Sequence, residues 1–378
     1  MSILLTLCIM LLAEDTASAS AEPMLTEPVQ LTFASEFHKA GESYFSDDGS
    51  RLIFQAVPVP PEGEEPGIHY GMYVSDVVRD SDGRVIGLEH TRCISPEGSA
   101  NTCGWFYPGR NDRVLFATTT TAPVQEDAPG YQRDSRDYRW QFPPEMNIIA
   151  VDLDRADGTS AGFEPLVADD EAYLAEGSIS PDGRHLLYTS LATGDGDLWV
   201  LDLHTGKTNV LVDAKGYDGG PFFSPDGRRI TYRSDRRGDD YLQVFVADLS
   251  FDETGSIIGI EREYQVTNND HVNWCPFWVR DGRALVYATS EVGHYNYEIF
   301  LVDADGGGED RPVRYGTGVR RVTNARGFDG LPAFTQDGET MVWTSQRAGD
   351  SSSQLWSAGF SIPERMLPEQ SGDGAVDH

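Results

Sequence analysis

One short motif recurs six times along the chain and limits what the chain can fold into. Its clearest copies are Ser180–Gly183 and Ser224–Gly227, both Ser-Pro-Asp-Gly, and each precedes a short apolar segment. Four weaker copies place Gly49, Asn111, Gly282 and Gly338 at the last position. Proline fixes φ, aspartate bonds the backbone ahead of it, and glycine or asparagine accepts a positive φ. Each copy therefore predicts a tight turn between two strands.

The segments around these turns predict a ring of small sheets. A strand-like segment precedes each turn, two more follow, and segments such as Gln265–Thr267 fit a fourth strand. Four antiparallel strands repeated six times predict an all-β fold, a six-bladed β-propeller. The last repeat lacks a fourth strand, whereas Gln30–Thr32 copies Gln265–Thr267. We expect the N-terminal strand to complete the last blade, because an unclosed ring leaves exposed sheet edges.

The two ends of the chain differ from the repeats. An apolar run, Ile3–Leu12, precedes small residues at Ala17–Ala21, as in a signal peptide. We expect a signal peptide over residues 1–21, the propeller over 22–362 and a disordered tail over 363–378. The protein would then be periplasmic or secreted. No other segment approaches the ~20 apolar residues of a membrane span.

The charge of the chain excludes one class of partner. Lys and Arg number 29 against 61 Asp and Glu, which gives a formal net charge of −32. An acidic surface repels phosphate backbones and keeps a protein solvated. We therefore expect a monomer that does not bind nucleic acid.

The repeated turns also carry a resemblance to a known family. Together with the preceding Gly-Gly-Pro-Phe-Phe at Gly219–Phe223, they resemble the TolB-like six-bladed propellers over about residues 29–360. The resemblance implies the propeller fold. Members of this group include periplasmic protein-binding propellers, propeller domains of serine peptidases and free-standing polysaccharide lyases, so the activity stays open. The sequence has no His-Glu-x-x-His and no Cys-x-x-Cys motif, which favours a binding module without a cofactor.

The segments that enter the innermost strands carry the first group of candidate site residues. Aligned on Gly220, they form a ring around the channel mouth: Glu42, Cys103, Glu176, Gly220, Cys275 and Leu331. Asp218 and Asp329 lie two positions earlier in their repeats, and His38 and His271 share a further offset. Such side chains can bind a divalent metal or a cationic group, or can be solvated rim residues. We take Glu42, Glu176, Asp218, Asp329 and His271 as candidate ligand-binding residues.

A long insertion carries the second group. Residues 119–145 lie between the second and third strands of repeat 2, on the same face as the mouth, and contain Arg136, Tyr138, Arg139 and Trp140. Aromatic residues interleaved with arginine suit sugar stacking and carboxylate binding. A structural flap packed on neighbouring blades is the alternative. His294, in the repeat 5 loop, is expected on the same face.

These residues lead to one functional prediction and one alternative. We expect an exported, non-enzymatic propeller that holds a protein segment or a glycan on the face with the channel mouth and residues 119–145. The alternative is a lyase-type enzyme acting on polysaccharide, with His38, His271 or His294 as base or metal ligand and Arg136 or Arg139 neutralising a uronate. Cys93 and Cys103 could form a disulfide in an oxidising compartment or stay free.

Overall fold

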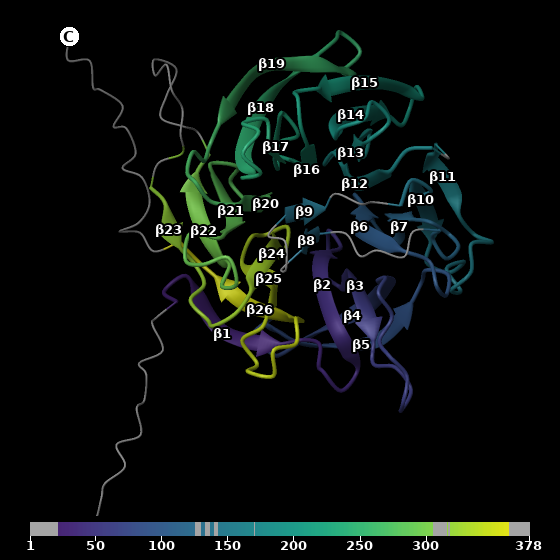
Figure 1. Ribbon diagram of the computed structural model, residues 1–378, viewed down its shortest axis with the longest axis vertical. Coiled ribbons are helices and arrows are strands. Elements are labelled where there is room, and N and C mark those ends of the chain that lie inside the picture. The colour runs from purple at the N-terminus through teal and green to yellow at the C-terminus, as the bar shows by residue number, and fades with distance from the viewer. Residues whose placement is uncertain are drawn as a thin grey trace, which may run out of the picture.

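The computed structural model describes residues 22–124, 130–132, 137–139, 143–169, 171–304, 316 and 318–362. This part of the chain consists of six four-stranded antiparallel sheets and one two-stranded hairpin. The sheets stand around a common axis, to which β2, β6, β12, β16, β20 and β24 lie nearest (Figure 1). The predicted six-bladed propeller is confirmed. The expected signal peptide, 1–21, and the expected tail, 363–378, lie outside the described residues.

The blades follow one another along the chain, each running from the axis outward. Blade 1 contains β2 (Phe37–Phe45), β3 (Arg51–Pro58), β4 (Gly71–Arg79) and β5 (Val85–Cys93). Blade 2 contains β6 (Asn101–Tyr107), β7 (Arg110–Thr118), β10 (Asn147–Asp152) and β11 (Glu164–Val167). Blade 3 contains β12 (Leu174–Ile179), β13 (His185–Ser190), β14 (Asp197–Asp202) and β15 (Lys207–Val212).

The second half of the ring repeats this order. Blade 4 contains β16 (Asp218–Phe223), β17 (Arg229–Ser234), β18 (Gln243–Phe251) and β19 (Ile257–Gln265). Blade 5 contains β20 (Asn273–Trp278), β21 (Ala284–Thr289), β22 (Glu298–Asp303) and β23 (Arg320–Arg321). Blade 6 contains β24 (Asp329–Phe334), β25 (Thr340–Ser345), β26 (Gln354–Phe360) and, from the start of the chain, β1 (Leu25–Gln30).

The repeated turn has the chemistry that the sequence predicts. In blade 4, Ser224 Oγ donates to Asp226 Oδ1 at 2.6 Å, the Arg228 N–H donates to the same oxygen at 3.0 Å, and Gly227 has φ 69°. Burial opposes ionisation of Asp226, but these donors lower its pKa. The turn carboxylates are therefore structural acceptors that fix the link between the first two strands.

Blade 2 departs from the predicted turn. Here the strands are joined more tightly, and Gly109 takes the positive φ, 69°, instead of Asn111. Asn111 lies at the start of β7, where its amide donates to Asp48 Oδ2 of blade 1 at 2.7 Å. The assignment of Asn111 to the glycine position is therefore wrong, because an earlier glycine in the same turn supplies the required conformation.

The N-terminal strand closes the ring as predicted. β1 pairs with β26 in antiparallel register and completes blade 6 (Figure 1). Gln30 Nε2 donates to the Thr32 carbonyl at 2.9 Å, as Gln265 Nε2 does to the Thr267 carbonyl at 2.6 Å. Thr32 Oγ1 then accepts the Leu355 N–H at 2.8 Å. The similarity between the two sequence segments thus reflects the same hydrogen bonds in two blades.

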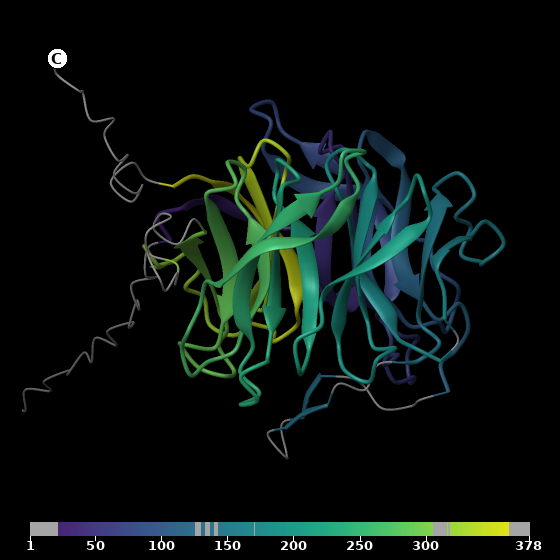
Figure 2. The same cartoon turned by 90° about the horizontal axis from the view of Figure 1, so that it is seen from above.

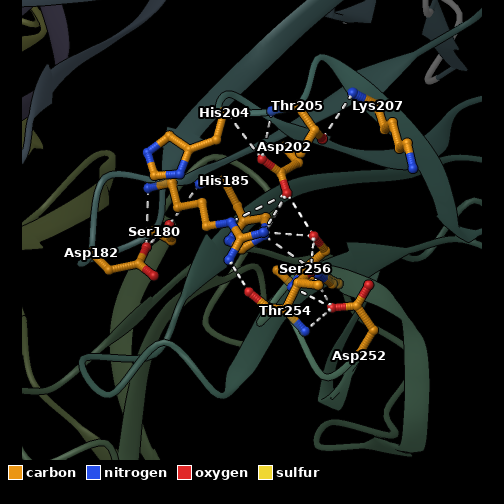
Figure 3. Close-up of polar contacts among 12 residues, drawn as sticks. Ser180, Asp182, His185, Asp202, His204, Thr205, Lys207, Asp252, Thr254 and Ser256 are labelled. Carbon is orange, nitrogen blue, oxygen red and sulfur yellow. Dashed lines mark hydrogen bonds and ion pairs between the residues drawn. The ribbon is translucent and has the colours of Figure 1, made fainter.

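Polar contacts also join neighbouring blades. Asp202, at the end of β14, accepts a hydrogen bond from Ser256 Oγ at 2.8 Å and forms an ion pair with Arg184 at 2.8 Å (Figure 3). Arg184 also donates to the Thr254 carbonyl at 2.6 Å, so it reaches the β18–β19 loop of blade 4. Burial opposes ionisation of Asp202, but these donors hold its pKa well below the usual value. Blades 3 and 4 are therefore linked outside the apolar core.

Candidate functional site

Every innermost strand carries a β-bulge at the same place. The register between the first two strands shifts there in all six blades. The bulged residues all have φ between 41° and 59°, and all line one cavity at the channel mouth. They are the ring predicted by alignment on Gly220: Glu42, Cys103, Glu176, Gly220, Cys275 and Leu331. The predicted geometry of this ring is therefore confirmed.

The backbone of this ring is strained. A positive φ costs an L-residue about 1–2 kcal/mol, and five of the six ring positions are not glycine. Bulges redirect side chains, and such strain gathers at binding and catalytic sites. The repeated bulge brings the carboxyl groups of Glu42 and Glu176 to the cavity. Its positive φ has a conformational free-energy cost that a regular strand does not have.

Aromatic side chains close the channel beneath the ring. Tyr44, Trp105, Phe222 and Phe277 each follow a ring residue by two positions. Their ring centroids lie 4.8 to 6.3 Å apart, including pairs from opposite blades such as Tyr44 and Phe222. The cavity is therefore blind, with a volume of about 620 Å³. This is within the size range of small-ligand pockets.

One wall of the cavity is aromatic. Trp274, Tyr297 and Phe328 lie with ring centroids 5.9 to 6.3 Å apart, and His294 lies 5.6 Å from Tyr297. All four residues line the cavity, and burial lowers the pKa of His294. Trp274 Nε1 is buried and has no hydrogen-bond partner in the part of the chain that the structure describes. This wall offers stacking surface and one unused donor.

Glu176 is held as a carboxylate on the opposite side. It forms an ion pair with Arg233 of blade 4, and its Oε2 accepts from Tyr217 Oη at 2.6 Å, Thr189 Oγ1 at 2.7 Å and the Gly220 N–H at 2.7 Å. Burial opposes ionisation, but Arg233 and these donors lower the pKa of Glu176. Glu176 is therefore a fully satisfied acceptor.

Glu42 has a different environment. Tyr44 Oη donates to Oε1 at 3.2 Å, Thr102 Oγ1 donates to Oε2 at 3.4 Å, and the Cys103 thiol is the third donor. All three groups are neutral, and no ion pair is seen for Glu42 among the described residues. Burial, aided by the charge of Glu176, raises the pKa of Glu42. Two carboxyl groups of one cavity are thus shifted in opposite directions.

The three cysteines of the described residues are free thiols. Cys103 and Cys275 line the cavity, and Cys93 is exposed on β5, so the Cys93–Cys103 disulfide is not formed. Burial raises the pKa of Cys275 to about 12 and that of Cys103 well above its usual value. Neither cavity thiol is a ready nucleophile at neutral pH.

Asp218 and Asp329 do not line the cavity, contrary to our expectation. Asp218 is fully buried beside Arg236 at 3.0 Å, and burial raises its pKa to about 6. Asp329 accepts from Trp343 Nε1 at 2.8 Å and pairs with Arg347. Each aspartate begins its innermost strand, before the bulge, where it holds an arginine from the end of the second strand. Their role in the blade is structural.

Only one of the three predicted histidines lies at the cavity. His294 lines the cavity, whereas His38 and His271 do not. His271 contributes its backbone carbonyl as an acceptor for Gln243 at 3.2 Å. Among the described residues, no group of three His, Cys, Asp or Glu side chains could hold a metal ion.

The insertion is described only in part. β8 (Gly130–Gln132) and β9 (Asp137–Arg139) form a hairpin that projects from one face near the axis (Figures 1 and 2). Tyr138 and Arg139 belong to β9, whereas Arg136 and Trp140 lie outside the described residues. Pro143 and Met146, which follow the hairpin, line the cavity, so the insertion ends at the predicted face.

Sequence reasoning missed Arg233 and Gln55, which line the cavity from the second strands. In its own blade, each pairs with the innermost-strand residue that precedes the bulge. Thr189 and Thr344 occupy the same position in blades 3 and 6. Arg233 is the one charged residue at this place in the repeat, which is the signal that could have revealed it.

One hydrolase-like string has no catalytic setting. Gly158–Gly162 reads Gly-Thr-Ser-Ala-Gly, which fits the Gly-x-Ser-x-Gly spacing of a nucleophile elbow. It lies in the loop between β10 and β11 instead of a turn from a strand into a helix. The match therefore does not indicate a hydrolase.

Comparison with known proteins supports the fold. A putative TolB from Agrobacterium tumefaciens shares 16% identity at a TM-score of 0.51, over 85% of this chain and 91% of that one. TolB from Acinetobacter baumannii shares 18% at 0.52, over 84% of this chain and 66% of that one. An oligogalacturonate lyase from Vibrio parahaemolyticus shares 14% at 0.46, over 90% and 94%, a likeness too weak to bear on function. No family model matches the chain.

These likenesses establish a TolB-like six-bladed propeller and nothing finer. In the described part of the chain, no helix is both long and apolar enough to cross a membrane.

Proposed function

We propose that the protein is an exported binding propeller whose channel mouth holds the tip of a protein segment or a glycan. The observation that carries this proposal is the ring of strained bulges around a blind cavity that contains two carboxyl groups and an aromatic wall. Strain of this kind persists where a rigid scaffold must present particular side chains. The closed floor means that a ligand enters by an end or a loop and does not thread through the channel.

The lining suits a ligand with both polar and flat groups. Glu42 and the Glu176–Arg233 pair supply polar contacts, while Trp274 and Phe328 supply stacking surface. Aromatic rings contact sugar faces and aromatic side chains in the same way, so the wall serves either ligand. The resemblance to periplasmic protein-binding propellers supports a protein segment and a periplasmic or secreted location.

A binding screen tests the proposal. We expect peptides or oligosaccharides to raise the melting temperature of the full chain, and Trp274→Leu to abolish that shift. Trp199→Leu is the matched control. Trp199 Nε1 is also buried without a partner among the residues that the structure describes, but Trp199 does not line the cavity. If ligand binding survives Trp274→Leu, or if neither class binds, the proposed site is wrong.

A second candidate is an enzyme acting on polysaccharide. It is favoured by the presence of Glu42 and His294 in one cavity, because the raised pKa of Glu42 suits a general acid and the lowered pKa of His294 suits a base. Glu42 would donate a proton to a leaving oxygen, with His294 as the base of the lyase-type alternative. Release of new reducing ends from a polysaccharide panel, lost in Glu42→Gln, supports this candidate; no release from any polymer excludes it.

A further inference from the structure

Blade 1 presents two hydrogen-bond acceptors to the cavity, Glu42, which has neutral donors only, and Gln55. The donors to Glu42 are the hydroxyl of Tyr44 at 3.2 Å, the hydroxyl of Thr102 at 3.4 Å and the thiol of Cys103. Gln55 is 8% exposed and lines the cavity, and its buried Oε1 has no hydrogen-bond partner among the described residues. The two residues lie side by side, since Gln55 pairs across the β2–β3 ladder with Gly41. A buried acceptor without a donor is costly, so a ligand with several donors would satisfy both residues.

The cations already in the cavity are used elsewhere. Arg233 is paired with Glu176. Lys39 places its Nζ over the Tyr70 ring, 4.4 Å from the centroid, and burial lowers its pKa. Within the described residues no ion pair joins Lys39 to Glu42. Arg233 lowers the pKa of Glu42 through its charge, but its ion pair is with Glu176, and among the residues that the structure describes no cation pairs directly with Glu42.

We propose that the cavity binds a primary ammonium group, with Glu42 as its counter-ion and Gln55 Oε1 as a second acceptor. This inference rests on the proposed binding function and narrows its ligand. An ammonium carries three donors, which match a carboxylate and an amide oxygen. The ring of Tyr44, which follows Glu42 at the cavity floor, gives a surface for the cation.

The ligand is assigned as a lysine side chain of a protein segment. A lysine has a long apolar stem that packs along aromatic surface while its charged end reaches a polar partner. The cavity suits this shape, because its lining combines the aromatic rings of Trp274 and Phe328 with the acceptors Glu42 and Gln55. The formal net charge of −32 draws cationic segments toward the protein. An amino sugar, whose amine sits directly on a ring, is the competing source.

Calorimetric titration of the full chain tests the assignment. The probe is the blocked peptide acetyl-Gly-Gly-Lys-Gly-Gly-amide, compared with twins that carry Nε-acetyl-lysine or norleucine. We expect the lysine peptide to bind at least ten-fold more tightly than either twin. Glu42→Gln should weaken it at least ten-fold, and Gln55→Leu should weaken it less. Glu36→Gln changes the net charge equally at an exposed site and should have no effect.

The outcomes separate this inference from the proposed function. Equal binding of the lysine peptide by wild type and Glu42→Gln, with both folded, overturns the ammonium site. If the norleucine peptide binds as tightly as the lysine peptide, the ammonium site is overturned as well, but the proposed binding function stands. Binding of glucosamine but not the lysine peptide overturns the assignment to a protein segment. If no peptide or sugar binds at all, both the inference and the proposed function fall.

Discussion

Arg233 occupies the space that any side chain at position 220 would need. An ideal Cβ built on Gly220 collides with the Arg233 guanidinium, which passes this point to reach Glu176 in blade 3. The glycine in an otherwise non-glycine ring is therefore explained by its neighbour. One missing side chain allows a buried ion pair to form across two blades at the edge of the cavity.

Replacing Gly220 with alanine should cost more than its positive φ alone. Gly220 and Gly183 have φ of 59° and 75°, but a Cβ on Gly183 meets no atom within 4 Å. We expect Gly183→Ala to lower the free energy of unfolding by about 1 kcal/mol. Gly220→Ala should lower it by about 3 kcal/mol more, because displacing Arg233 leaves Glu176 as an uncompensated buried charge.

Urea unfolding of the two alanine variants measures this difference. Equal losses would show that Arg233 moves aside freely and that the Glu176 pair adds little to stability. Ligand binding by Gly220→Ala gives an independent readout, since this variant alters the cavity edge and Gly183→Ala does not.

Asp202 should make the blade 3–blade 4 contact sensitive to acid. Its pKa in the folded protein lies below the usual 3.8, so its contribution is present above that pH and is lost as the pH falls through the folded value. We expect Asp202→Asn to lower stability at pH 7 by about 1.5–3 kcal/mol, through the weaker bonds to Arg184 and Ser256.

The same comparison at pH 3 should show a smaller gap between Asp202→Asn and wild type. Chemical unfolding at both pH values provides the measurement. A gap that stays constant between pH 7 and pH 3 would contradict a carboxylate stabilised by its donors.

Thr32 should be as important to the ring as its counterpart inside the chain. Thr32 Oγ1 accepts the Leu355 N–H at 2.8 Å, and Thr267 Oγ1 accepts the Val244 N–H at 2.9 Å. Valine at either position leaves a buried N–H without an acceptor, which costs about 1–3 kcal/mol. We expect similar losses of unfolding free energy for Thr32→Val and Thr267→Val. A negligible effect of Thr32→Val alone would mean that β1 does not hold blade 6.

The fold could be predicted because it depends on local signals that are repeated. The turn at Ser224–Gly227 needs only its own residues, and the Gln-x-Thr pattern shared by Gln30 and Gln265 marks equivalent outer strands. The cavity ring followed from the same regularity, since the bulge occurs at one position in every blade. Because the six blades repeat the same strand pattern, Glu42 and Gly220 could be assigned to equivalent positions from this one sequence.

The chemistry of the site could not be predicted in the same way. Asp218 and Asp329 share a repeat position with lining residues of other blades, but arginines at the ends of the second strands keep them buried. Arg233 pairs with a residue 57 positions away, in another blade. Such pairings depend on which side chains meet between blades, and a repeat pattern read from one sequence does not contain that information.

Blade 5 has two charged side chains at positions where blade 4 has the amide side chains of two glutamines. Glu298 and Arg321 form an ion pair at 2.6 Å, in the places of Gln243 and Gln265. Glu298 is fully buried, and burial raises its pKa to about 7, above the usual 4.5. The folded state therefore binds a proton that the unfolded state releases, and stability should fall as pH rises from about 4.5 through 7.

The double variant Glu298→Gln with Arg321→Gln copies blade 4 and removes this titration. We expect it to match wild type near pH 4.5 and to be more stable at pH 8 by roughly 1–3 kcal/mol, the ion pair with half-exposed Arg321 offsetting part of the burial cost. The test is to measure the unfolding free energies of wild type and the double variant between pH 4.5 and pH 8. If the double variant is less stable than wild type at pH 8, the stabilisation from the Glu298–Arg321 ion pair exceeds the cost of burying the Glu298 carboxylate. The charged pair would then stabilise blade 5 more than the two glutamines would.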